Sequence, residues 1–142
     1  MTDISLTVAQ AIVAHSIAYG AERGWNPLST VVVDAGGHAI AFARGDLAPP
    51  GRLELAIGKA KMAVMLGMGG TEIGEKAELR PAFFTSLAQA YGPFALPGQG
   101  GGLIKDASGR VIGGIGVTGA TSQQDAEAAT FAITACGFTA EI

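Results

Sequence analysis

Two short turns between apolar segments constrain the fold more than any other feature of the sequence. Residues 28–34 and 38–44 have the composition of β-strands and flank an Ala-Gly-Gly turn, and residues 103–106 and 110–117 flank Asp-Ala-Ser-Gly. In such turns an aspartate side chain accepts backbone N–H groups, and glycine supplies a positive φ. Turns this short join only antiparallel strands, because a parallel connection needs a crossover of a dozen or more residues. The sequence therefore predicts two hairpins.

The segments around the hairpins have helical patterns. Apolar residues recur at helical spacing over residues 5–23, where Ser5 is a plausible N-cap. Thr121 and Gln124 have the spacing of a capping box. Hairpins covered by helices give an α+β layer fold. Further helices are expected at 52–67, from Thr71 to about Ala77, at 81–90 and at about 122–136, and a short edge strand is expected at Phe94–Leu96.

Bulk composition limits the class of protein. The 142 residues fit a single domain, residues 1–142, and the net charge of −3 without a Lys/Arg cluster argues against nucleic acid as a partner. One cysteine allows no intrachain disulfide. Neither a secretion signal nor a membrane-spanning run is evident, so a cytoplasmic protein is expected. Because 49% of the residues are apolar and only 15% are charged, we expect a second copy of the chain to cover some of the surface.

One glycine motif imitates a cofactor site. Residues 114–120 match G-x-G-x-x-G/A, the dinucleotide-binding pattern. That pattern requires a βαβ unit, whereas the strand before this one belongs to a hairpin and no second parallel strand can follow. Nicotinamide and flavin binding by this motif are therefore not expected.

A second glycine-rich segment is a stronger candidate. Residues 92–102 contain two prolines and five glycines and are expected to form a loop. Four glycines within residues 98–102 cost backbone entropy. They either line a ligand site with main-chain groups or form a flexible connector. The N-terminus of the helix near Ser122 could hold a carboxylate or propionate beside that loop.

Few side chains are candidates for metal or proton chemistry. His15 is either a boundary residue of the first helix or an axial iron ligand. His38 is either at a pocket rim or simply exposed in its hairpin. Lys59 lies among alanines, so it is either a solvated lysine or a desolvated group with a lowered pKa. No cluster has the spacing of a structural zinc site, so no metal ion other than haem iron is expected.

Several motifs together resemble a known family. The segments are Val-Val-Asp-Ala-Gly-Gly-His at 32–38, Glu-Leu-Ala-Ile-Gly-Lys-Ala at 54–60 and Ile-Gly-Gly-Ile-Gly-Val-Thr-Gly-Ala-Thr-Ser-Gln-Gln-Asp at 112–125. They resemble the GlcG/HbpS-like family, which includes the C-terminal domain of PduO-type proteins. The resemblance implies a profilin-like fold, an antiparallel sheet with helices on its faces. It also implies homo-oligomers, from dimers to octamers, and haem binding in several members.

The first functional hypothesis is a small-ligand-binding protein that takes haem or another tetrapyrrole. Haem needs an apolar slot, an axial ligand and cations for its propionates. The slot is expected near the first helix or between subunits. Candidate cofactor-binding residues are His15, Arg44 and Arg52.

The second hypothesis is an enzyme of small-molecule catabolism: an isomerase or tautomerase, a hydratase or a decarboxylase acting on a carbonyl or carboxylate substrate. Backbone N–H groups of residues 98–102 would hold a developing oxyanion, and a side chain of shifted pKa would move a proton. The sequence leaves open whether the chain is catalytic. Candidate catalytic residues are Lys59, His38 and Asp125, and candidate substrate-binding residues are Asp34, Glu54, Gln99, Gly100, Gly101, Gly102, Thr121 and Ser122.

Overall fold

The computed structural model describes residues 3–142 and confirms the predicted α+β class. Within those residues it has five helices and five strands that alternate in an irregular order. The elements are α1 (Leu6–Glu22), β1 (Ser29–Asp34), β2 (Ala39–Arg44), α2 (Arg52–Leu66), α3 (Gly70–Leu79), α4 (Pro81–Tyr91), β3 (Gly101–Lys105), β4 (Val111–Thr118), α5 (Ser122–Ala135) and β5 (Thr139–Glu141).

All strand pairs are antiparallel, in the order β2-β1-β4-β3-β5. The two predicted hairpins are β1–β2 and β3–β4, and pairing between β1 and β4 joins them into one sheet. Both turns have the hydrogen bonds to aspartate that the sequence predicts. Asp34 Oδ1 accepts the backbone N–H of Gly36 and His38, and Asp106 Oδ1 accepts those of Ser108 and Arg110.

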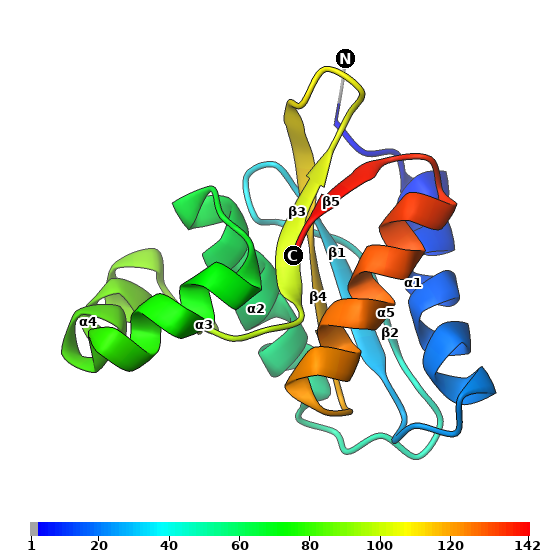
Figure 1. Ribbon diagram of the computed structural model, residues 1–142, viewed down its shortest axis with the longest axis horizontal. Helices are drawn as coiled ribbons and strands as arrows, with labels where there is room; N and C mark the ends of the chain where they lie inside the picture. Colours follow the sequence, from blue (N-terminus) through cyan, green and yellow to red (C-terminus); the bar gives the residue numbers. More distant parts are fainter. Residues whose placement is uncertain (1–2) are drawn as a thin grey trace.

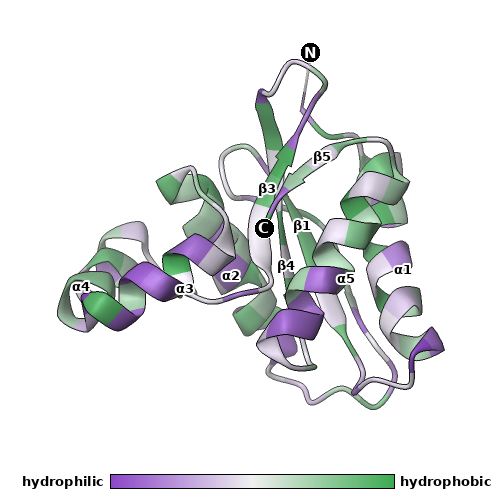
Figure 2. Cartoon of the chain, viewed as in Figure 1, coloured by the Kyte–Doolittle hydropathy of each residue, from purple (hydrophilic) through white to green (hydrophobic). Residues whose placement is uncertain are grey.

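The sheet is the middle of three layers. Helices α1 and α5 cover one face and α2 covers the other, while α3 and α4 project away from the sheet (Figure 1). Hydrophobic residues concentrate in the central strands, and hydrophilic ones gather on α3 and at the start of α5 (Figure 2). The larger core lies under α1 and α5 and contains Ile12, Val32 and Ile115, all fully buried.

Glycines on β4 bring α2 unusually close to the sheet. A Cβ at Gly116 would overlap the carbonyl oxygen of Ala56, and one at Gly114 would meet Val64 Cγ1 at 2.6 Å. These are the first two glycines of the G-x-G-x-x-G/A match. The motif therefore serves helix–sheet packing in this fold.

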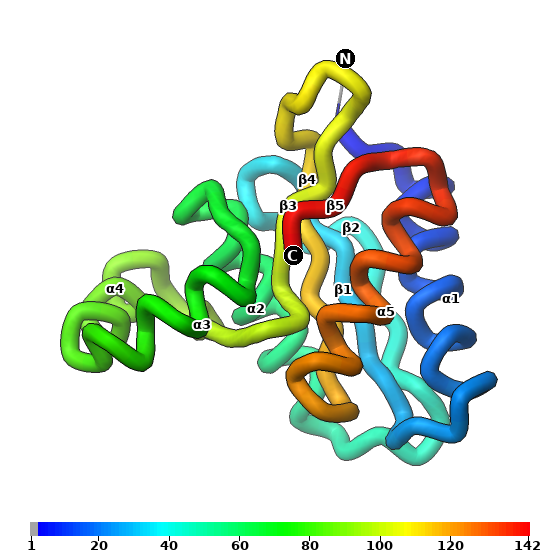
Figure 3. Tube along the Cα trace, in the orientation of Figure 1, coloured from blue at the N-terminus to red at the C-terminus, as the bar shows by residue number. Residues whose placement is uncertain are grey.

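Two predictions near the chain's later half are wrong. Residues 94–96 form no strand, because Phe94 has a φ of +71° and the N–H of Leu96 donates to the carbonyl of Gly58 in α2. Gly101 and Gly102, predicted to lie in the loop, are the first residues of β3. The sequence also gave no sign of β5, which returns along β3 and brings the C-terminus beside it (Figure 3).

Helix boundaries agree closely with the sequence patterns. Ser5 Oγ accepts the N–H of Val8 at the start of α1, and Thr121 and Gln124 form the predicted capping box at the start of α5. Within residues 3–142, none of these helices is long and apolar enough to cross a membrane.

Candidate functional site

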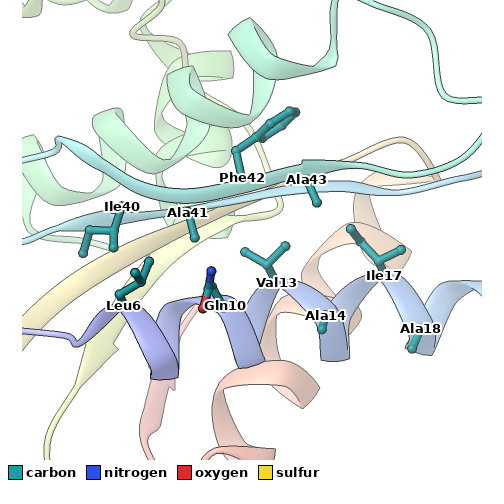
Figure 4. Close-up of a pocket in the computed structure, with 10 residues that line it drawn as sticks. All are labelled: Leu6, Gln10, Val13, Ala14, Ile17, Ala18, Ile40, Ala41, Phe42 and Ala43. Carbon is teal, nitrogen blue, oxygen red and sulfur yellow. The ribbon is translucent and has the colours of Figure 1, made fainter.

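An apolar groove runs between α1 and the edge strand β2. It has a volume of about 680 Å³, within the ordinary range for ligand pockets. Figure 4 shows Ala41 and Ala43 pointing toward α1, whereas Phe42 points away from it. Gln10 is the only polar side chain in the lining, which holds no histidine, cysteine, methionine or tyrosine. The groove can accommodate an apolar molecule, but its lining residues offer no side chain that ligates iron.

A histidine lies on a different face of the same helix. The imidazole of His15 is exposed and meets the ring of Phe131 from α5 nearly edge-on, with ring centroids 6.5 Å apart. The Phe131 ring in turn lies 4.4 Å from that of Tyr19, and the Arg23 guanidinium lies 3.3 Å from the centre of the Tyr19 ring. We call these four residues the aromatic strip. It follows the seam between α1 and α5.

The aromatic strip and the groove are separate surfaces. His15, Tyr19 and Arg23 are spaced four apart, so they form one row along α1. Groove residues such as Gln10 and Ala14 form another row, rotated by about 100° or more around the helix axis. A ligand bound by His15 would therefore lie over α5 rather than in the groove.

Hydrogen bonds hold the end of the aromatic strip that contains Tyr19 and Arg23. The hydroxyl of Tyr19 donates to Glu127 Oε2 at 2.6 Å, and this hydrogen bond raises the pKa of Tyr19. Arg23 Nη1 donates to the carbonyl oxygen of Tyr19 at 3.0 Å. The strip thus has an imidazole at one end and a held guanidinium at the other.

A buried ion pair joins α2 to α5 around the end of the sheet. Lys59 Nζ donates to the Val117 carbonyl at 2.9 Å and to Asp125 Oδ2 at 3.2 Å. The side chains are only 13% and 4% exposed. Asp125 Oδ1 also accepts the N–H of Ala120. The two residues that the sequence assigned to one site are therefore directly paired.

Burial dominates the electrostatics of this pair. It lowers the pKa of Lys59, although the Asp125 carboxylate opposes the shift. It also raises the pKa of Asp125, more than Lys59 and the Ala120 N–H lower it. Of the two alternatives that the sequence left open for Lys59, the structure favours the desolvated lysine. Each charge is held mainly by the other, so neither can exchange a proton with a substrate without breaking the pair.

The glycines of residues 98–102 make room for these protein groups. A Cβ at Gly100, whose φ is +99°, would meet Asp125 Cβ at 2.9 Å and Lys59 Nζ at 3.3 Å. One at Gly101 would meet the backbone of Lys59, and one at Gly102 would meet the backbone of Ile142. Gly100, Gly101 and Gly102 therefore pack against the protein itself.

A small polar pocket lies beside Gly98 and Gln99, at the start of the glycine-rich segment. It has a volume of about 260 Å³, and Gly98, Gln99 and Ser122 contribute to its lining together with α3. Gln99 Nε2 donates to Thr71 Oγ1 at 3.2 Å across it. Of the loop residues predicted to bind substrate, only Gln99 faces this pocket.

A cluster of polar side chains lies at the start of α2. Arg52 Nη1 donates to Thr118 Oγ1 at 3.4 Å, while Arg52 Nε and Ser29 Oγ are buried without a hydrogen-bond partner in the described part of the chain. Since α2 covers the sheet face opposite α1, Arg52 does not share a site with His15 within one chain (Figure 1).

The remaining candidate residues are dispersed. The His38 side chain is 84% exposed, and its ring lies 3.4 Å from Asp34 in the β1–β2 turn. Arg44 and Glu54 are exposed, on β2 and α2, and Thr121 is used as the N-cap of α5. Within residues 3–142 no three His, Cys, Asp or Glu side chains gather as metal ligands would.

Sequence reasoning placed His15 next to Tyr19 but missed Phe131 and Arg23 as members of the aromatic strip. The i, i+4 spacing of His15, Tyr19 and Arg23 is visible in the sequence and could have indicated a shared helix face. The position of Phe131 beside that face could not be predicted, because it depends on how α5 packs on α1.

Comparisons with known proteins agree on one family. A family model described as haem degrading protein HbpS-like matches residues 4–134. A double mutant of HbpS from Streptomyces reticuli superposes with a TM-score of 0.83 at 27% identity, covering 96% of this chain and 89% of that one. The ORFY protein of Klebsiella pneumoniae superposes with a TM-score of 0.79 at 27% identity, covering 96% and 92%.

A haem complex is also among the similar structures. The PduOC:heme complex has a TM-score of 0.84 at 22% identity and covers 99% of both chains. At that identity the likeness concerns the fold alone. No curated protein matches this sequence.

Proposed function

Because the chain belongs to the HbpS-like family, we propose that it binds haem and that His15 is an axial ligand of the iron. The observation that carries the proposal is the exposed imidazole of His15 at the head of the aromatic strip. Neutral imidazole is the commonest protein ligand of haem iron, and an exposed ring can reach iron without rearrangement of the core.

The aromatic strip suits the rest of a haem molecule. Phe131, which is exposed and is backed by the Tyr19 ring, offers ring surface for the macrocycle beside His15. Arg23 lies on the same helix row, about 12 Å along the axis from His15, and supplies a cation for a propionate. Arg23 thus replaces Arg44 and Arg52 in this role, since neither of those lies on the strip.

The chain's own residues orient and hold the cofactor. Bound haem would supply redox-active iron, while His15 ligates, Phe131 packs and Arg23 neutralises charge. The PduOC:heme complex, which shares the fold, supports haem binding in general and assigns no role to any residue of this chain. The enzyme hypothesis receives no comparable support, because Lys59 and Asp125 neutralise each other and His38 lies in a separate turn.

We also propose that the chain forms homo-oligomers, from dimers upward. Exposed apolar side chains gather on the projecting α3–α4 region, where Leu79 is 83% exposed and Phe83 is 44% exposed. A second copy would remove this surface from water. Light scattering after size-exclusion chromatography should give a multiple of the chain mass, and Leu79→Asp should reduce it. A monomer at every concentration would refute self-association.

The haem proposal is tested by absorbance titration of the purified protein with hemin. The two histidines of the chain provide a matched pair of variants, His15→Ala and His38→Ala. The wild type and His38→Ala should give the same Soret band of ligated haem at saturation. His15→Ala should lose that band or shift it toward free hemin, with an affinity at least about tenfold lower.

Each outcome separates the parts of the proposal. Absence of saturable binding in the wild type refutes haem binding. An unchanged spectrum in His15→Ala removes His15 as the ligand. If Ala14→Trp, which fills the groove, abolishes binding while His15→Ala does not, the groove rather than the aromatic strip is the haem site.

A further inference from the structure

The start of α2 holds a buried polar cluster that haem binding by His15 does not use. It consists of Ser29 on β1, Thr118 on β4 and Arg52 on α2, and the Lys59–Asp125 pair lies beside it. Ser29 is completely buried and Thr118 is 3% exposed. Arg52 is partly exposed, whereas Arg52 Nε and Ser29 Oγ are buried, so a ligand reaches these two atoms only when the Arg52 side chain moves.

The side chains of the cluster face one another. Ser29 and Thr118 are directly opposite in the β1–β4 ladder, so their side chains emerge on the same sheet face. That face is the one under α2, because Arg52 Nη1 donates to Thr118 Oγ1. Val31, two residues along from Ser29, packs against Ala56 of α2 and confirms the direction.

Two polar atoms in this cluster have no hydrogen-bond partner among residues 3–142. Ser29 Oγ and Arg52 Nε are both buried and make no hydrogen bond there. Leaving a buried donor unsatisfied is costly, and more so when it belongs to a charged group. The bond from Arg52 to Thr118 is long at 3.4 Å. The arrangement is therefore suited to an acceptor from outside the chain.

The local charge is positive. Arg52 and Lys59 are cations, and Asp125 is the carboxylate that faces them. Within residues 3–142 Arg52 has no carboxylate oxygen within ion-pair distance, since Asp125 pairs with Lys59. Gly51, the N-cap of α2, provides no side-chain acceptor for the first turn, and Glu54 in that turn offsets part of the positive charge of the helix end.

We propose that this cluster binds the carboxylate group of a small organic acid, held by Arg52 and by the hydroxyl of Ser29. The free Nε edge of a guanidinium matches the two oxygens of a carboxylate, a geometry that a spherical halide cannot use. Ser29 donates a further hydrogen bond to one of those oxygens. The Lys59 charge adds attraction, while its own bonds go to Asp125 and Val117.

The test uses haem-free protein, so its result does not depend on the haem proposal. Sodium chloride is replaced stepwise by sodium formate or acetate at fixed ionic strength, while Tm is followed and binding of ¹³C-formate is measured by NMR. The variants are Ser29→Ala, Arg52→Leu and Arg52→Lys, with Arg44→Leu as a control that removes an exposed arginine.

The proposal predicts saturable formate binding and a rise in Tm for the wild type and Arg44→Leu. Affinity should fall about tenfold or more in Ser29→Ala and in both Arg52 variants, because each loses a hydrogen bond to a charged group. In chloride, Ser29→Ala should be at least as stable as the wild type, since it removes an unpaired hydroxyl. Equal binding in all variants, or no preference for formate over chloride, would overturn the proposal.

Discussion

The buried pair of Lys59 and Asp125 provides the sharpest test of the packing described above. Replacing Asp125 with Leu leaves the Lys59 ammonium buried with one remaining partner, the Val117 carbonyl. It also removes the acceptor of the Ala120 N–H. Replacing Lys59 with Met leaves the Asp125 carboxylate, which is 4% exposed, buried without its cation. Either single change therefore leaves an uncompensated charge inside the protein.

The expected magnitudes follow from this burial. Breaking a buried pair by removing one partner costs about 3–5 kcal/mol of unfolding free energy. The double variant Lys59→Met/Asp125→Leu leaves no buried charge and fills a similar volume with apolar groups. Its loss should be below about 2 kcal/mol, or it should be more stable than the wild type. The raised pKa of Asp125 and the lowered pKa of Lys59 agree with a small loss or a gain of stability in the double variant, because burial disfavours the charged forms of both residues.

Urea unfolding of the wild type, both single variants and the double variant measures the coupling energy directly. The exposed pair Glu72–Lys76 is the control, because its charged atoms are 3.0 Å apart but both side chains are 51% exposed. Its coupling should be only about 0.3–0.5 kcal/mol. If the losses of Lys59→Met and Asp125→Leu simply add in the double variant, the ion pair is not the interaction described here.

Four further changes have defined outcomes. Gly116→Ala should destabilise the fold by at least about 3 kcal/mol, because its Cβ would overlap the Ala56 carbonyl. Gly74→Ala has open space around its Cβ and should stabilise α3 by roughly 0.5–1 kcal/mol. Urea titrations measure both changes. Burial holds the pKa of Lys59 below its usual 10.5, so the unfolded chain binds more protons below that pH. The stability of the wild type relative to Lys59→Met should then rise as pH increases toward 10.5, and a flat difference would contradict the shift. Thr121→Ala should cost about 0.5–2 kcal/mol through loss of the capping box, measurable as a lower Tm.

Much of the fold could be predicted because its signals are local. Alternating and β-branched residues marked β1, β2 and β4, the aspartate turns set their antiparallel pairing, and capping residues located the helix starts. β5 carried no comparable signal, since it is three residues long and is stabilised by its pairing with β3. The positive φ of Phe94, which prevents a strand there, was likewise not apparent from a residue type that usually favours strands.

The candidate site could be predicted only in part, because few of its features depend on local sequence. The small residues around Lys59 left a solvated and a desolvated lysine as alternatives, and the packing of α2 against β4 and α5 buries it. The glycines at 100–102 could not be interpreted from sequence, because what they make room for lies on α2, α5 and the C-terminal residues. Glycine allows any close approach, and the sequence does not distinguish a ligand from another part of the chain.

The central claim is that haem binds over the seam between α1 and α5, with His15 on the iron. Proton–nitrogen NMR spectra of the protein with ferric hemin test this most directly, since paramagnetic iron broadens the signals of nearby amides. The account predicts broadening at His15, Tyr19 and Phe131, with the amides of Ala41 and Ala43 across the groove preserved. Broadening confined to β2 and the groove-facing row of α1, or no broadening at His15, would contradict it.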